Sequence, residues 1–149
     1  MVFIFSIFQP FSIYIMFERL MKYLCRLGID YDVQENSQVF DFQVRSTVGK
    51  WNCLLSLQST AGICFYSTLF TAVPRSKQQQ MALFLMYLNN QQLFGNFELD
   101  FKTSDVRFKT YLDLDNNDFN EKLLDRVMFR NVSTMEKHFD QIMKFIKAA

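Results

Sequence analysis

The sequence has 149 residues, half of them hydrophobic and 17% aromatic, with a formal net charge of +1. A chain of this length suits one domain that buries about 68–70% of its unfolded surface. Four Gly and two Pro are too few for a disordered or collagen-like chain, and the balanced charge disfavours nucleic-acid binding, which normally needs a basic excess.

The N-terminal stretch is apolar: residues 1–17 carry no charged side chain, and thirteen of these seventeen are hydrophobic. It lacks the basic start and the small-residue cleavage site of a signal peptide. Pro10 interrupts it, and it is shorter than the ~20 apolar residues of a membrane span. Three interpretations of residues 1–15 stay open: a non-native or dispensable extension with Met16 as the native start, a membrane association, or an additional packing element. Residues 16–149 are expected to form one domain.

The first predicted element is a helix over about residues 12–27. Phe17, Leu20 and Leu24 recur at helical spacing, and Gly28 lies where a C-cap glycine belongs. Period-two alternation then predicts four strands: residues 29–34, 40–45, 51–58 and 63–70. The first of these strands is short, and a turn is expected at Glu35-Asn36-Ser37.

The strand over residues 63–70 is apolar on both faces. Alternation places Ile63, Phe65 and Leu69 on one face, and Cys64, Tyr66 and Phe70 on the other. Such a strand is either central and covered on both sides or part of an interface. The run from Trp51 to Pro74 carries no charge. We therefore predict a partner or dimer surface that includes five residues of this run: Trp51, Leu54, Cys64, Tyr66 and Phe70.

A second helix is predicted after Pro74. Ser76 with Gln79 three positions later is typical of a capping box. Residues 81–88 (MALFLMYL) are apolar nearly all round the helix, which predicts deep burial, and the helix is expected to end near Phe94-Gly95.

A β-hairpin follows, with alternation in residues 97–102 and 106–111. With a short loop, Asp100 would face Arg107 and Glu98 would face Lys109 on the solvent side. The core-facing side chains would be Phe97, Leu99, Phe101, Val106 and Phe108.

The C-terminal third predicts a long helical region, begun by a capping signal of Asp118 with Glu121. Its apolar stripe comprises Leu124, Met128, Met135, Phe139, Ile142 and Ile146. Ser133 with Glu136 could restart a helix, so a kink near Asn131 is one alternative. The order α-β(3 or 4)-α-β-β-α predicts an α+β fold in which an antiparallel β-sheet packs against helices.

Residues that could support catalysis or ligand binding are sparse. His138 is the single His and lies off the apolar stripe, which favours a surface position. Glu98 and Asp100 share a strand face as hydrolase carboxylates do, but Arg107 and Lys109 would neutralise them. Cys25, Cys53 and Cys64 lack metal-ligand spacing and are expected to be small buried hydrophobic residues in a reducing compartment. Because the four Gly are isolated, no phosphate-binding loop is predicted.

Most of the sequence resembles a known family. The runs GNFELDFKTSDVRFKTYLDL (residues 95–114) and LLDRVMFRNVSTMEKHFDQIMKFI, preceded by KWNCLLSLQ, GICFYSTLF and VP in the same order, resemble the YbjN-domain family, especially its cyanobacterial-type branch. The resemblance covers about residues 16–146 and departs at Ser104-Asp105, where a Gly is common. It implies a fold similar to type III secretion chaperones, and a loosely described role in sensory transduction or stress regulation. It carries over no active site.

The resulting expectation is a non-enzymatic protein-interaction module, chaperone-like or a regulatory adaptor, with a polypeptide partner, a homodimer or both. We expect no cofactor, metal or nucleic acid, a cytoplasmic (or plastid stromal) location, and membrane contact only if residues 1–15 are retained. The alternatives are a small-ligand sensor with a pocket between sheet and helices, and, less favoured, an enzyme that uses Glu98, Asp100 or Cys53.

Overall fold

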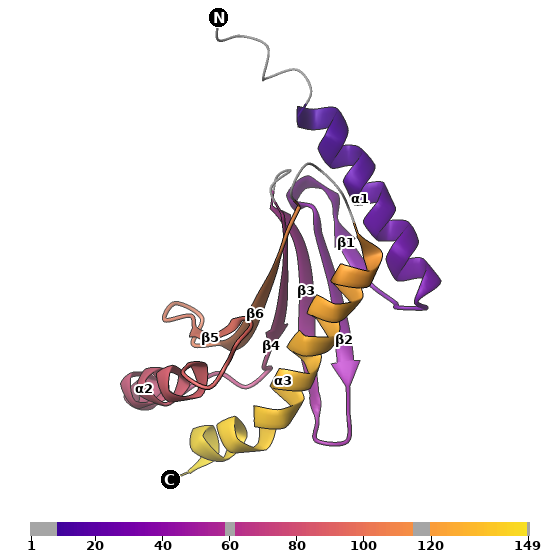
Figure 1. Ribbon diagram of the computed structural model, residues 1–149. Coiled ribbons are helices and arrows are strands. Elements are labelled where there is room, and N and C mark those ends of the chain that lie inside the picture. The colour runs from indigo at the N-terminus through magenta and orange to yellow at the C-terminus, as the bar shows by residue number, and fades with distance from the viewer. Residues whose placement is uncertain (1–8, 59–61, 115–119, 149) are drawn as a thin grey trace, which may run out of the picture.

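The computed structural model describes residues 9–58, 62–114 and 120–148, which form one antiparallel sheet and three α-helices (Figure 1). The sheet has six strands in the order β1-β2-β3-β4-β6-β5. The elements are α1 (Gln9–Arg26), β1 (Asp32–Gln34), β2 (Val39–Arg45), β3 (Lys50–Gln58), β4 (Gly62–Thr68), α2 (Gln78–Asn89), β5 (Asn96–Leu99), β6 (Val106–Asp113) and α3 (Glu121–Lys147), with 3-10 turns at Glu35–Ser37 and Arg75–Lys77. The predicted α+β class is confirmed, with four strands before α2.

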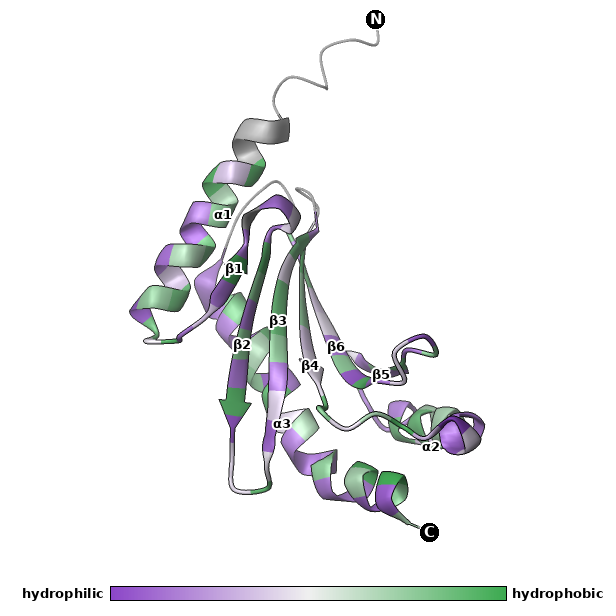
Figure 2. Cartoon of the chain, turned by 180° about the vertical axis from the view of Figure 1, so that it is seen from behind, coloured by the Kyte–Doolittle hydropathy of each residue, from purple (hydrophilic) through white to green (hydrophobic). Residues whose placement is uncertain are grey.

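The helices lie on one side of the sheet. In Figures 1 and 2, α3 crosses this side diagonally, α1 lies beside it along β1, and α2 packs next to β5 at the other edge. Alternate residues of the strands point towards the helices and form a single core with them. Its largest fully buried strand side chains are Phe40, Trp51, Leu55, Ile63, Phe65 and Phe108.

α1 begins at Gln9 and therefore runs through the predicted boundary at residues 15–16. Its C-terminus is a Schellman motif, in which Gly28 N donates to Cys25 O and Ile29 N donates to Leu24 O. Gly28 has φ +68°, a left-handed conformation that glycine adopts without strain. The predicted C-cap is confirmed.

α2 differs from its prediction in three respects. It ends at Asn89, with Asn90 as its C-cap, so the predicted end near Phe94-Gly95 is wrong. The helix begins at Gln78, after the 3-10 turn that contains Ser76, and no side chain caps it, so the predicted capping box is wrong. Met81, Leu85 and Leu88 are buried at i, i+4 and i+7, whereas the other side of the helix is exposed. The exposed apolar residues of this side are Leu83, Met86 and Tyr87. Deep burial on all sides is therefore wrong, because α2 lies at the edge of the sheet and packs on one side only.

The hairpin of β5 and β6 is confirmed, but its register is shifted by two residues. Glu98 faces Arg107, and Phe97 faces Phe108. The connection between the strands comprises residues 100–105. Asp100 N donates a hydrogen bond to Asp105 O across it, and Lys102 N donates to the Asp100 carboxylate. Phe101 lies in this connection and is exposed, so its predicted core position is wrong.

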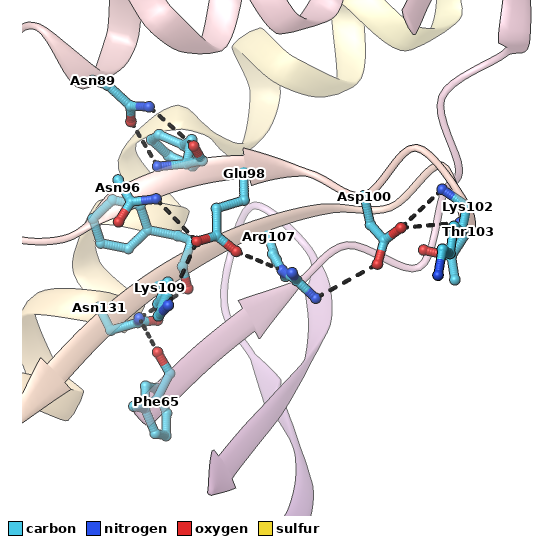
Figure 3. Close-up of polar contacts among 12 residues, drawn as sticks. Phe65, Asn89, Asn96, Glu98, Asp100, Lys102, Thr103, Arg107, Lys109 and Asn131 are labelled. Carbon is cyan, nitrogen blue, oxygen red and sulfur yellow. Dashed lines mark hydrogen bonds and ion pairs between the residues drawn. The ribbon is translucent and has the colours of Figure 1, made fainter. Parts of the chain in front are cut away.

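α3 is one continuous helix, and Ser133 and Glu136 lie inside it rather than at a new start. Asn120 is its N-cap and accepts a hydrogen bond from Leu123 N; the predicted cap, Asp118, lies outside the described residues. The buried stripe contains two polar members, Asn131 and His138. The amide of Asn131 reaches the sheet, where Nδ2 lies 3.0 Å from both Phe65 O and Phe108 O (Figure 3).

Candidate functional site

Figure 2 shows the side of the sheet that faces away from the helices, where hydrophobic and hydrophilic residues alternate along the strands. We define the open face as Leu54, Cys64, Tyr66, Phe70 and Tyr111. Strand register places Tyr66 at its centre, between Leu54 on β3 and Lys109 on β6, with Cys64 opposite Tyr111. The sequence predicted that β4 is apolar on both sides. One set of its side chains lies in the core and the other set lies on the open face.

Positive charges surround the aromatic residues of the open face. The Arg107 guanidinium lies 5.3 Å and the Lys109 ammonium 5.8 Å from the centre of the Tyr66 ring, and Lys50 lies 5.8 Å from that of Phe70. These are cation–π distances. Burial is the largest cause that raises the pKa of Tyr66, to about 12, so its hydroxyl stays protonated at neutral pH and can donate a hydrogen bond.

The five residues of the predicted partner surface do not all share this face. Leu54 and Tyr66 are half-buried on it, and Phe70 is exposed at its end. Cys64 points to the same face but is 5% exposed. Trp51 is 0% exposed and packs against Phe139 of α3, with the ring centres 5.8 Å apart and the ring planes tilted by 38°. Its place on a surface is therefore wrong: Lys50 and Asn52 point to the open face, and alternation turns Trp51 towards the helices.

Glu98 and Asp100 form a charge ladder with the neighbouring strand (Figure 3). Arg107 Nε donates to Glu98 Oε2 at 2.8 Å, while the predicted pairs, Asp100 with Arg107 and Glu98 with Lys109, are diagonal contacts at 3.8 Å. Backbone N–H groups of Lys102 and Thr103 lower the pKa of Asp100. A carboxylate stabilised in its charged form is a poor general acid at neutral pH.

The thiol of Cys53 is a core group. The side chain is fully buried, and burial raises its pKa to about 12, against hydrogen bonds from Ser67 and Trp51 that lower it. A nucleophilic cysteine needs the thiolate, which this environment disfavours. Within the described residues, no three His, Cys, Asp or Glu side chains lie close enough to hold a metal ion.

His138 is buried rather than on the surface, so that prediction is wrong. Its ring packs edge-on against Phe97 at 5.6 Å, and its Nε2 lies 3.3 Å from Gln92 Nε2. Burial, the largest cause, lowers its pKa. The neutral ring is thus a polar packing residue that connects α3 to the segment after α2.

Two residues that shape these surfaces were missed in the sequence. Tyr111, 48% exposed, extends the open face beside Cys64, and its alternation with Thr110 and Leu112 was the available signal. Asn131 lies three residues after Met128 and four before Met135, so its position fits the buried stripe. A prediction that counts only apolar residues does not detect it.

The model of a family described as "Putative bacterial sensory transduction regulator", YbjN, matches residues 17–144. The chain belongs to the YbjN family. The predicted family is thereby confirmed, while its cyanobacterial-type branch stays a prediction.

A solved YbjN structure has a similar fold. The crystal structure of YbjN from E. coli, described as "a putative transcription regulator", superposes with a TM-score of 0.64 at 14% sequence identity, over 84% of this chain and 92% of that chain. No protein with a curated description matches the chain. Of the helices that the structure of this YbjN-family chain describes, none has the length and apolar content of a membrane span.

Proposed function

We propose that this protein is a non-enzymatic interaction module, a chaperone-like or regulatory adaptor, which binds another polypeptide or a second copy of itself through the open face. One observation carries the proposal: the described helices pack on one side of the sheet (Figure 2), and the strand register places the half-buried Leu54 and Tyr66 and the exposed Tyr111 on the other side. Aromatic side chains with adjacent Arg are the residues most enriched at protein interfaces.

The remaining expectations form part of the same proposal. The protein acts without a cofactor, as a regulator rather than an enzyme, since Cys53 is a buried thiol and Glu98 is paired with Arg107. It does not bind nucleic acid, because its net charge is +1. It works in the cytoplasm, or in the stroma in a plastid-bearing source, and contacts a membrane only if residues 1–15 are retained.

Site-specific photo-crosslinking in cells tests this proposal. A benzoylphenylalanine at position 66 replaces one aromatic ring by another at the centre of the open face, and the same label at Gln141, exposed on α3, is the matched control. We expect one or a few discrete adducts from position 66 only, whose masses distinguish a second 17.8 kDa chain from another polypeptide. Tyr66→Asp should abolish adducts formed from a label at position 111. Equal crosslinking from positions 66 and 141 would refute the proposal.

A small-ligand sensor is the second candidate, and one cleft favours it. The cleft, of about 510 Å³, lies between α1 and the 3-10 turn before β2, within the usual range of ligand pockets. Its lining residues include Phe17, Met21 and Gln38. A screen of small apolar ligands by thermal shift tests it: a hit should lose its effect in Met21→Glu, and a screen without such hits would exclude this candidate.

A further inference from the structure

A second apolar surface lies on the helix side of the sheet, where the segment after α2 approaches α3. A cleft of about 250 Å³ is lined by Gln92, Leu93, Phe94, Phe129, Arg130, Ser133, Thr134 and Lys137. We refer to it as the α3 groove. Its apolar side chains are unusually accessible: Leu93 is 91% exposed, Phe129 72% and Phe94 54%. Isolated exposed apolar residues need no explanation, but three that line one cleft indicate a binding surface.

The segment that forms one wall of the groove is fixed at both ends. The Asn89 side chain bonds both backbone groups of Phe97, accepting from N at 2.6 Å and donating to O at 2.9 Å (Figure 3). Gln92 contacts His138 on α3 at 3.3 Å. Gly95, with φ +72°, makes a turn in which a Cβ would collide with Lys109 O. The groove is thus pre-organised, which lowers the ordering cost of binding.

The charge of the groove is positive. The Arg130 guanidinium lies 3.8 Å from the centre of the Phe94 ring, and Lys137 lies on the same side of α3. Neither forms an ion pair with any residue that the structure describes, and no carboxylate is among the lining residues. Arg126 and Lys144, at spacings of four and seven residues from this pair, extend the same helix side. Unpaired cations beside exposed aromatic rings complement an anionic, partly apolar ligand.

We propose that the α3 groove binds an acidic polypeptide segment, with an apolar side chain between Phe94 and Phe129 and adjacent carboxylates on Arg130 and Lys137. The cleft is below the ~300–1,000 Å³ of pockets for whole small ligands but has room for a side chain. A flat membrane cannot enter a concave cleft, and the chain's net charge of +1 lacks the basic excess that is typical of nucleic-acid binding. This inference does not rest on the function proposed for the open face.

Selection from a random twelve-residue peptide library, displayed on phage and exposed to the immobilised full chain, identifies the preferred ligand. We expect the enriched peptides to combine Asp or Glu with Leu, Phe or Trp. Their synthetic versions, measured by fluorescence anisotropy, should bind about tenfold more weakly to Arg130→Glu, a change equivalent to about 1.4 kcal/mol. Binding should also weaken as salt rises.

Three variants make the result specific. Leu93→Asp should weaken binding without affecting folding, because this side chain is almost fully exposed. Lys102→Glu, at an exposed lysine in the β5–β6 connection, and Tyr66→Asp, on the open face, should leave binding unchanged. Enrichment of basic peptides, or equal affinity for Arg130→Glu, would overturn the proposal. The proposal would also be overturned if the protein bound phosphatidylserine vesicles or a thirty-nucleotide single strand more tightly than any selected peptide, and Arg130→Glu abolished that binding.

Discussion

Asn131 offers the sharpest test of how α3 is seated on the sheet. The residue is 0% exposed, and its Nδ2 is within 3.0 Å of Phe65 O and Phe108 O and 3.1 Å of Thr110 Oγ1. It therefore connects α3 to both β4 and β6 at the centre of the sheet. Replacing the amide by a carboxylate in Asn131→Asp keeps the shape but removes the donor, and it brings a charge against backbone oxygens.

The magnitude follows from the burial. An Asp with the ordinary pKa of about 3.9 must take up a proton to be buried uncharged, which costs about 4.2 kcal/mol at pH 7 and about 1.5 kcal/mol at pH 5. Because the folded-state pKa is raised above the unfolded value, the penalty is absent below pH ~3.9 and grows as pH rises. Asn131→Leu should instead lose about 2 kcal/mol for two hydrogen bonds, independently of pH. The loss is partly offset because Oδ1 accepts no hydrogen bond from the described part of the chain.

Urea unfolding at pH 5 and pH 7 measures both variants, with the fluorescence of the single, fully buried Trp51 and far-UV circular dichroism as probes. The destabilisation by Asn131→Asp, relative to wild type at each pH, should grow by about 2.7 kcal/mol from pH 5 to pH 7. Asn36→Asp, at an exposed site, is the control and should show no such change. A pH-independent difference for Asn131→Asp, or equal stability of the Asp and Leu variants at pH 7, would refute the buried position of this amide.

Three further predictions concern single side chains. Gly95→Ala should lower the melting temperature more than Gly28→Ala does. Both positions have positive φ, which costs a residue with a Cβ about 1–2 kcal/mol, but only at Gly95 would the new Cβ meet a strand carbonyl. Equal effects of the two substitutions would contradict this. The predicted burial of Cys25 is wrong, because this residue is exposed near the end of α1. Cys25 should therefore react with Ellman's reagent in the native protein, whereas Cys53, whose pKa burial raises to about 12, should react only in denaturant. The single His signal in the NMR spectrum should titrate below pH 6.5, because burial lowers the pKa of His138. As pH drops through 6.5, the unfolded chain takes up the proton before the folded protein does, so the free energy of unfolding should fall. His138→Gln should remove this pH-dependent contribution.

The strands β2, β3 and β6 were predictable because one side of each is buried. In β2, the alternation of Phe40 and Phe42 with polar residues leaves one register in which the core is apolar. The hairpin register was not predictable in the same way. It depends on the connection between β5 and β6, where Asp100 bonds the backbone of Lys102 and Thr103, and such loop geometry has no periodic signal in the sequence.

Composition could not tell which apolar residues are exposed. Residues 81–88 are hydrophobic all round, so periodicity gave no direction to α2, and its edge position decided that Leu83 and Met86 face outward. The opposite error occurred in α3: His138 and Asn131 were left out of the predicted core because their side chains are polar, but both are buried. Buried polar residues depend on partners from other elements, here Gln92 and two strand carbonyls, which a single sequence does not reveal.

The open face and the α3 groove lie on opposite sides of one hairpin, and this arrangement bears on whether they can act separately. Glu98 and Arg107 pair on the open-face side, while Phe97 packs on His138 beneath the groove. The hairpin is held in place by seven residue pairs between β6 and β4 and by the Asn89 amide on Phe97. Because the hairpin is bonded on both sides, we expect a ligand on one surface not to displace it, and binding at the two surfaces to be independent. Two partners could therefore occupy the protein together, as the proposed adaptor function requires.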